Sequence, residues 1–309
     1  MTNPIIQHDY IAYGLNIRSE IILEHLVVKG FEHPDVVIRV GKVPNQIDRV
    51  KKTGECWVAN DAEFLLSIPD VAKFHVCNGT DITIEPAKSA AMTAIHAFLL
   101  GSGFAAILHQ RNQVVLHASA VQVDGKVIAF AGYSGAGKST TAAHFIQKGA
   151  KLIADDLSVL EHGSQISVLS AIPQNKLSGE SLEKLGMSSK GLKQIDVDRN
   201  KYLVPTKDGF DVGSYPLDAI FVARLRPVSH PTVRRISSKS AIKILQNRTF
   251  RRRYICDGQL PKLFQSWSKI AQNVPMFEIV RPIEGQSLDA VAKLIELQIN
   301  EINLVKQGC

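Results

Sequence analysis

The feature that most constrains this chain is the glycine-rich stretch GYSGAGKS, residues 132–139, which follows the apolar run VIAFA of residues 127–131. It fits the pattern G-x-x-x-x-G-K-[ST] at every fixed position, and a helical segment follows it. Glycine and small residues let the backbone curl so that successive N–H groups point at one anion, together with the positive end of the next helix. The pattern therefore predicts a phosphate-binding loop between a buried strand and a helix; an ordinary glycine-rich turn is the alternative.

The side chains and backbone of this loop are expected to share the phosphate contacts. Lys138 is predicted to reach the outer phosphates of a nucleotide, and the Ser139 hydroxyl is predicted to hold Mg²⁺. The residues expected to bind the nucleotide are Gly132, Ser134, Gly135, Ala136, Gly137, Lys138, Ser139 and Thr140.

Two adjacent acids, Asp155 and Asp156, lie inside the apolar segment of residues 151–160. A carboxylate in an apolar strand is costly unless it meets a charge or a metal. Adjacent residues of a strand point to opposite faces, so the two acids share a task only if the strand ends or bends there. The functional interpretation is that one acid accepts the proton of an attacking hydroxyl while the other helps to place Mg²⁺. Solvated acids at a loop edge are the alternative.

His117 belongs to the predicted strand of residues 114–123, which runs into Asp124 and Gly125. An Asp-Gly pair between two apolar runs predicts a hairpin, so this strand should pair antiparallel with the strand that enters the glycine loop. A lone histidine on a strand is more often structural than catalytic, but this pairing favours a functional role. The guanine-reading pattern Asn-Lys-x-Asp has its nearest match in NKLS, residues 175–178, which lacks the aspartate. Adenine is favoured by elimination.

The chain has 309 residues, enough for one large domain or two modest ones, and its 45% hydrophobic content can support a sizeable core. We expect a β-rich N-terminal domain over residues 1–86 and a second domain over residues 87–309. Short β-type runs separated by turn signals indicate the first; the predicted strands lie at residues 10–17, 36–40, 55–58, 74–76 and 82–85. The second is predicted to contain strands at residues 151–160, 165–171, 217–225 and 276–280, and helices at 139–148, 179–185, 238–246, 261–272 and 287–300.

The apolar run of residues 90–108 raises the question of a membrane span. It carries His96 and is broken by Gly101 and Gly103, which favours a buried helix over residues 87–100 that ends near Leu100. The N-terminus has no basic region followed by an apolar one, so we expect no signal peptide and a cytoplasmic protein.

The formal charge of +7 is a local excess, because Arg248, Arg251, Arg252 and Arg253 crowd one segment. A nucleotide or an acidic peptide explains this cluster as well as nucleic acid does, and a solvated helix end is an equal alternative. We expect neither a nucleic-acid nor a membrane partner. The cysteines are scattered without a C-x-x-C pair, so spacing indicates neither a zinc site nor a disulfide framework; they are Cys56, Cys77, Cys256 and Cys309.

The segment from His117 to Asp156 resembles the catalytic domain of HPr kinase/phosphorylase, a bacterial serine kinase distantly related to phosphoenolpyruvate carboxykinase. The resemblance is carried by His117 before the loop, by the loop itself, by QKG at residues 147–149 and by LIADD at residues 152–156. It implies an α/β fold, namely a phosphate-loop kinase domain of the HPr kinase/phosphoenolpyruvate carboxykinase type, with ATP and Mg²⁺. It implies Asp155 as the general base and Asp156 beside Mg²⁺ and His117. The implied catalytic residues are Asp155, Asp156, His117 and Lys138, and the implied metal ligands are Ser139 and Asp156.

Weaker similarity extends to smaller HPr-kinase-like proteins, which include lasso-peptide precursor kinases. It rests on residues 13–15, 19–20, 116–119, 173–177, 247–251 and 281–282. The second signature of true HPr kinases, Glu-x-Arg-Gly-x-Gly, is missing, and the corresponding region reads IPQNKL at residues 172–177. This departure counts against HPr as the substrate, against phosphorolysis and against the family's hexamer; another homo-oligomer stays open.

The residues and the resemblance together predict an ATP-dependent serine kinase that acts on a peptide or protein, such as a lasso-peptide precursor. Lys138 and the loop amides would stabilise phosphoryl charge while Asp155 takes the hydroxyl proton. A kinase of a small molecule such as free serine is one alternative. The other is a non-catalytic ATP-sensing regulator, against which the paired acids argue because a sensor needs no base.

Overall fold

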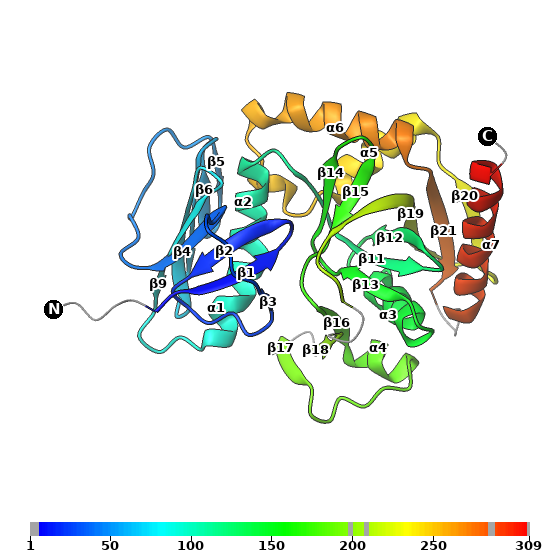
Figure 1. Ribbon diagram of the computed structural model, residues 1–309, viewed down its shortest axis with the longest axis horizontal. Helices are drawn as coiled ribbons and strands as arrows, with labels where there is room; N and C mark the ends of the chain where they lie inside the picture. The colour runs from blue at the N-terminus through cyan, green and yellow to red at the C-terminus, as the bar shows by residue number, and fades with distance from the viewer. Residues whose placement is uncertain (1–5, 197–199, 207–209, 284–287, 308–309) are drawn as a thin grey trace. The chain divides into compact units, whose positions relative to one another are not determined.

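The computed structural model describes residues 6–196, 200–206, 210–283 and 288–307 (Figure 1). The chain divides into two compact units, Met1–Val115 with Phe250–Gln265 and Leu116–Thr249 with Ser266–Cys309. These units differ from the predicted segments 1–86 and 87–309, because a helical segment after residue 86 and a later segment both belong to the first unit. Two of the borders fall within β10 (Val114–Leu116) and α6 (Leu260–Asn273), and the third lies between Thr249 and Phe250.

The first unit is built on a mixed sheet with the strand order β3-β1-β2-β4-β9-β8-β7-β6-β5. Its central strands alternate buried and half-exposed residues, so one face is apolar. The strands are β1 (His8–Ala12), β2 (Leu15–Ser19), β3 (Val27–Val28), β4 (Val36–Val40), β5 (Lys52–Gly54), β6 (Trp57–Ala59), β7 (Glu63–Ile68), β8 (Ala72–Cys77) and β9 (Asp81–Pro86).

The single strand predicted over residues 10–17 is wrong, because β1 and β2 form a hairpin there. Tyr13 and Gly14 make its two-residue turn, with φ of 57° and 71°. Positive φ at both turn positions matches the twist of the flanking strands, and the apolar letters on either side conceal the turn.

The helix predicted to end near Leu100 continues to Gln110. It consists of α1 (Met92–Phe98), a π-helical turn (Leu99–Gly103) and α2 (Phe104–Gln110). The buried side chains after the glycines explain the continuation: Phe104 packs against Tyr13 with ring centroids 5.5 Å apart. This segment, Met92–Gln110, is long and apolar enough to cross a membrane, but 67% of its most apolar window is buried inside the protein, as in a core helix.

The second unit contains a mixed sheet in which β14-β15-β19-β12-β11-β13 are neighbours and β21 lies between β19 and β20. Its apolar side chains pack against α3 and α7 through Phe145 and Ile295. The elements are β11 (Ala118–Val123), β12 (Lys126–Gly132), α3 (Lys138–Gln147), β13 (Lys151–Ala154), β14 (Ser158–His162), β15 (Ile166–Leu169), β19 (Ser214–Arg226), β20 (Thr232–Arg235), α5 (Ser238–Arg248), β21 (Met276–Pro282) and α7 (Leu288–Gln307).

The predicted strand pairing is confirmed. Strand β11 pairs antiparallel with β12 across Asp124 and Gly125, which both have positive φ. Strand β14 pairs antiparallel with β15. On its other side β12 pairs parallel with β19, so the strand that enters the glycine loop has one antiparallel and one parallel neighbour.

The strand predicted over residues 151–160 is two strands, β13 and β14. The break falls at the acids: Asp156 adopts the left-handed region with φ of 71°, and the Leu157 N–H donates to the Asp155 carbonyl over 2.9 Å. A small sheet not expected from the sequence lies nearby, formed by β16 (Gln174–Ser178), β18 (Lys201–Pro205) and β17 (Lys193–Asp196), and α4 (Gly179–Lys184) follows β16. Residue 287, the start of the last predicted helix, lies outside the described residues.

Candidate active site

The glycine-rich loop joins the end of β12 to the start of α3, as predicted. Gly135 and Gly137 have φ of 78° and 87°, which glycine adopts without steric cost. Gly132 is held close to the neighbouring strand, since a Cβ there would lie 2.9 Å from the Ala223 carbonyl oxygen. Glycine is therefore favoured at Gly135 and Gly137 by the backbone conformation. At Gly132 it is favoured by the close approach of the loop to β19.

The two side chains expected to meet phosphate and metal each contact a polar group close by. Lys138 donates from Nζ to the Tyr133 carbonyl over 3.1 Å, and burial lowers its pKa. The Ser139 hydroxyl donates to Asp155 Oδ1 over 3.0 Å. The loop lysine is thus folded over the loop, and the loop serine touches the first acid of the pair.

Asp155 is a buried hub of hydrogen bonds. Besides Ser139, its Oδ1 accepts from the Ser119 hydroxyl over 2.5 Å, and its Oδ2 accepts from the Lys176 N–H over 2.7 Å. Burial, which disfavours the charged form, outweighs these bonds and raises the pKa of Asp155. A cation beside this carboxylate would offset the cost of burying its charge.

Asp156 faces a different environment. Its Oδ2 accepts from Lys176 Nζ over 3.1 Å, and its Oδ1 lies 3.6 Å from His117 Nε2. Burial raises the pKa of Asp156, but Lys176, His117 and Lys201 outweigh it, and the pKa falls well below its usual range. Asp156 is therefore ionised at neutral pH.

His117 lies in the gap between β10 and β11, next to the second acid. Burial, followed by the charge of Lys138, lowers the pKa of His117 to about 4. The imidazole is therefore neutral at pH 7, so it faces Asp156 without carrying a charge.

These groups surround a cleft of about 390 Å³ within the second unit. The predicted residues that line it are His117, Ser134, Gly135, Gly137, Lys138, Ser139, Thr140 and Asp156. Ala136 and Asp155 are buried behind this surface, and Gly132 lies where the loop leaves β12. The volume falls in the range of small-ligand sites.

Sequence reasoning missed four cations that line the same cleft, Lys176, Lys184, Lys201 and Arg281. Arg281 comes from the end of β21 and donates to the Ala136 carbonyl over 3.4 Å. Lys176 lies on β16 between the buried residues Asn175 and Leu177. The cations make the cleft suited to a polyanion.

The donor set beside the loop fits Mg²⁺, which prefers oxygen ligands. The Ser139 hydroxyl and the Asp155 carboxylate supply oxygens 3.0 Å apart, held in place by Ser119. The resemblance implies Asp156 beside the metal, whereas the Ser139 hydroxyl contacts Asp155. The positions of the side chains favour Asp155 as the acid on the metal side.

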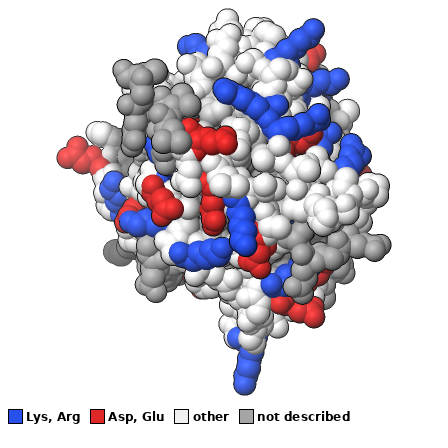
Figure 2. Space-filling model, turned by 90° about the vertical axis from the view of Figure 1, so that its right-hand side faces the viewer, with Lys and Arg blue, Asp and Glu red and all other residues white. Residues whose placement is uncertain are grey.

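The four arginines of the cluster are divided between the two units. Arg248 lies in the second unit with its guanidinium 3.4 Å from the Tyr133 ring centroid of the glycine loop. Arg251 and Arg253 belong to the first unit and lie over the rings of Phe250, Tyr254 and Trp57. Among the described residues on the face in Figure 2, Lys and Arg are interspersed with Asp and Glu rather than gathered into the stripe typical of nucleic-acid binding.

No model of a known protein family matches this chain, and no curated protein matches it. Among solved structures, the chain is similar to the HPr(Ser) kinase/phosphatase from Coxiella burnetii, at 15% sequence identity and a TM-score of 0.33. The similarity covers 61% of this chain and 98% of that chain. A likeness at this identity and TM-score shows neither a shared family nor a shared activity, so the functional assignment depends on this chain's own residues.

Proposed function

We propose that this chain is an ATP- and Mg²⁺-dependent kinase that transfers the γ-phosphoryl group to a serine hydroxyl of a peptide or protein. One observation carries the proposal. A glycine-rich loop, the Ser139–Asp155 contact and the ionised Asp156 border one cleft that cations also line.

The cations hold and orient the nucleotide in this proposal. Lys138 and the backbone N–H groups of the loop bind the phosphates, and Arg281 and Lys201 add positive charge around them. Positioning and charge stabilisation supply most of the rate in phosphoryl transfer, because the transition state asks for little covalent chemistry from the protein.

Asp156 is the acid placed to receive the acceptor hydroxyl. Its carboxylate faces the cleft, so it accepts the hydroxyl proton as the new P–O bond forms and the bond to ADP breaks. Lys176 holds the carboxylate in position from Nζ. We therefore assign to Asp156 the base role that the resemblance implies for Asp155.

Mg²⁺ would be held by Ser139 and Asp155, and when bound it neutralises charge on the transferring phosphates. The buried hydrogen bonds of Asp155 fix that carboxylate on the Ser139 hydroxyl. Asp155 is thus a positioning and metal-holding residue, separate from the proton acceptor.

A serine of a peptide, as in a lasso-peptide precursor, is the acceptor class that the resemblance favours, with the protein working in the cytoplasm where ATP is present. Incubation with ATP labelled in its γ-phosphate, with a serine-containing peptide and with free serine in parallel, tests this. Label in the peptide is the expected result. Label in free serine alone would identify a small-molecule kinase, and ATP binding without labelling of any acceptor would identify a sensor.

Lys138→Met is the matched variant for this assay, with Lys148→Met as its control. We expect Lys138→Met to lower transfer by about two to three orders of magnitude, because it removes a cation at the site of developing charge. Lys148 is half-exposed at the other end of α3 and pairs with Glu296, so its variant should keep wild-type activity.

A further inference from the structure

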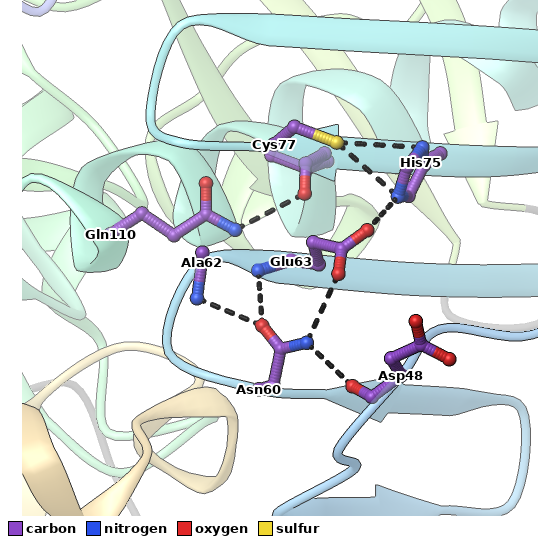
Figure 3. A network of polar contacts seen from close by, with 8 residues as sticks. Asp48, Asn60, Ala62, Glu63, His75, Cys77 and Gln110 are labelled. Carbon is purple, nitrogen blue, oxygen red and sulfur yellow. Dashed lines mark hydrogen bonds and ion pairs between the residues drawn. The ribbon is translucent and has the colours of Figure 1, made fainter.

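Three side chains of different chemistry converge on the half-buried face of the first unit's sheet. Glu63 on β7 is directly opposite Cys77 on β8, and His75 lies two residues before Cys77 on the same face. One ligand atom from each lies within 4.8 Å of the others. Figure 3 shows the three side chains directed toward one another. Carboxylate, imidazole and thiolate are the three side-chain types that bind Zn²⁺.

The separations in this cluster are close to those of a metal site. His75 Nε2 lies 3.0 Å from Glu63 Oε1, and Cys77 Sγ lies 3.2 Å from His75 Nε2. Tetrahedral Zn²⁺ with its usual bond lengths places nitrogen and oxygen ligands about 3.3 Å apart and sulfur and nitrogen ligands about 3.5 Å apart. The two pairs that include His75 therefore need to move apart by only a few tenths of an ångström, within ordinary side-chain freedom.

A neighbouring amide holds the carboxylate in place. Asn60 Nδ2 donates to Glu63 Oε2 over 3.1 Å and to the Asp48 carbonyl over 2.8 Å, while Asn60 Oδ1 accepts the N–H groups of Ala62 and Glu63 (Figure 3). These contacts leave Oε1 directed at His75. Outer partners of this kind orient the ligands of metal sites.

A second carboxylate lies close to the cluster. Asp81 on β9 is opposite Cys77 on the other side of β8, and it also pairs with Arg39. A metal ion in the cluster would be attracted by the negative charge of Glu63 and, to a smaller extent, by that of Asp81.

We propose that Glu63, His75 and Cys77 bind one Zn²⁺ ion, with water in the fourth position. Binding releases the thiol proton to solvent and joins β7 to β8, and the site does not depend on the proposed kinase activity. Sequence spacing gave no sign of it, because the ligands come from two strands and include a single cysteine.

Cobalt(II) substitution tests the site directly. The full chain is freed of metal with a chelator, kept reduced with a phosphine and titrated with Co²⁺. We expect a thiolate-to-cobalt charge-transfer band that saturates at one ion per chain and disappears when Zn²⁺ is added. Co²⁺ bound at the oxygen ligands of the glycine loop gives no such band, so failure of the kinase proposal leaves this result unchanged.

The variants assign the ligands. Cys77→Ser should abolish the band, and His75→Ala and Glu63→Gln should weaken binding at least about tenfold. Cys56→Ser, which removes another half-buried thiol of the same unit, should keep the band. Absence of the band in the wild type, or its persistence in Cys77→Ser, would overturn the proposal.

A second measurement on the wild type covers the case in which Cys77→Ser does not fold. Zn²⁺ should slow alkylation of Cys77 at least about tenfold, as located by peptide mass mapping, and should leave alkylation of Cys56 unchanged. Equal rates for Cys77 with and without Zn²⁺ would overturn the site.

Discussion

Asp155 and Asp156 are neighbours in the chain, but their surroundings act on their protons in opposite directions. Burial raises the pKa of Asp155, whereas Lys176, His117 and Lys201 outweigh burial at Asp156 and lower its pKa. Two carboxylates pushed apart in this way are suited to different tasks in one reaction. The left-handed backbone at Asp156 interrupts the strand at the acids, and Asp156 lines the cleft while Asp155 lies buried behind it.

Substitution by alanine is expected to lower stability by different amounts at two glycines of the loop. A Cβ on Gly132 would lie 2.9 Å from the Ala223 backbone oxygen and 3.2 Å from the Ala136 Cβ, whereas a Cβ on Gly135 meets open space. We expect Gly132→Ala to destabilise the protein by about 2–3 kcal/mol. Gly135→Ala should cost only the left-handed backbone strain of about 1 kcal/mol. Urea denaturation would measure both, and equal losses would contradict the steric account of Gly132.

His109 predicts a pH dependence of stability. It is buried and bonded from Nε2 to the Phe250 carbonyl, and burial lowers its pKa from 6.5 to about 4. The unfolded state therefore binds the proton more readily, and stability should fall by about 2 kcal/mol from about pH 7 to pH 5.

The variant His109→Gln should reduce this pH dependence, since glutamine does not titrate, and the contribution of His117, whose pKa is also about 4, should remain. The exposed His33 serves as the control, and His33→Gln should keep the wild-type slope. Urea denaturation followed by circular dichroism at both pH values makes the comparison. An unchanged slope in His109→Gln would show that another group is responsible.

At the residue level, the sequence was informative about the loop and both acids, because their letters follow a fixed pattern in the chain. Lys176 and Ser119 were not predicted as site residues. Their contacts with Asp155 join residues 21 and 36 positions apart, and only the fold brings them together.

At the scale of elements, strands β11 and β12 and helix α3 were predictable because the turn between the strands and the glycine that ends the helix have distinct chemistry. The break between β13 and β14 was not, because apolar residues continue on both sides of the acids. The helical segment that continues to Gln110 was predicted to end near Leu100, because Gly101 and Gly103 disfavour a helix. The burial of Phe104 outweighs the low helix propensity of these glycines.

Helix α4 should depend on a small apolar cluster for its position beside the cleft. Leu182 packs with Ala143 and Leu177, while Glu180 and Ser181 of the same helix line the cleft. We expect Leu182→Ala to lower stability by about 2–4 kcal/mol and to weaken ATP binding severalfold. Leu297→Ala, at an exposed position of α7, should change stability by less than about 0.5 kcal/mol. ATP affinity would be measured by calorimetry. An unchanged affinity in Leu182→Ala would show that the position of α4 does not affect ATP binding.

At the scale of the whole molecule, the sequence predicted two regions but not their membership. Residues 250–265 return to the first unit, where Tyr254 packs on Trp57 and Phe64 with ring centroids 4.8 and 4.5 Å apart. Such pairing joins residues nearly two hundred positions apart. Local patterns carry no information about it.

The central claim is that the acids and the glycine-rich loop serve one phosphoryl transfer, and paired substitutions of the acids test it most directly. ATP binding, the Mg²⁺ requirement and single-turnover transfer to a serine peptide would be measured for Asp156→Asn and Asp155→Asn. Asp289→Asn is the control, an acid exposed on α7. The account predicts that Asp156→Asn binds ATP normally but loses transfer by at least about a hundredfold, and that Asp155→Asn raises the Mg²⁺ requirement. Near wild-type transfer in both variants would contradict it.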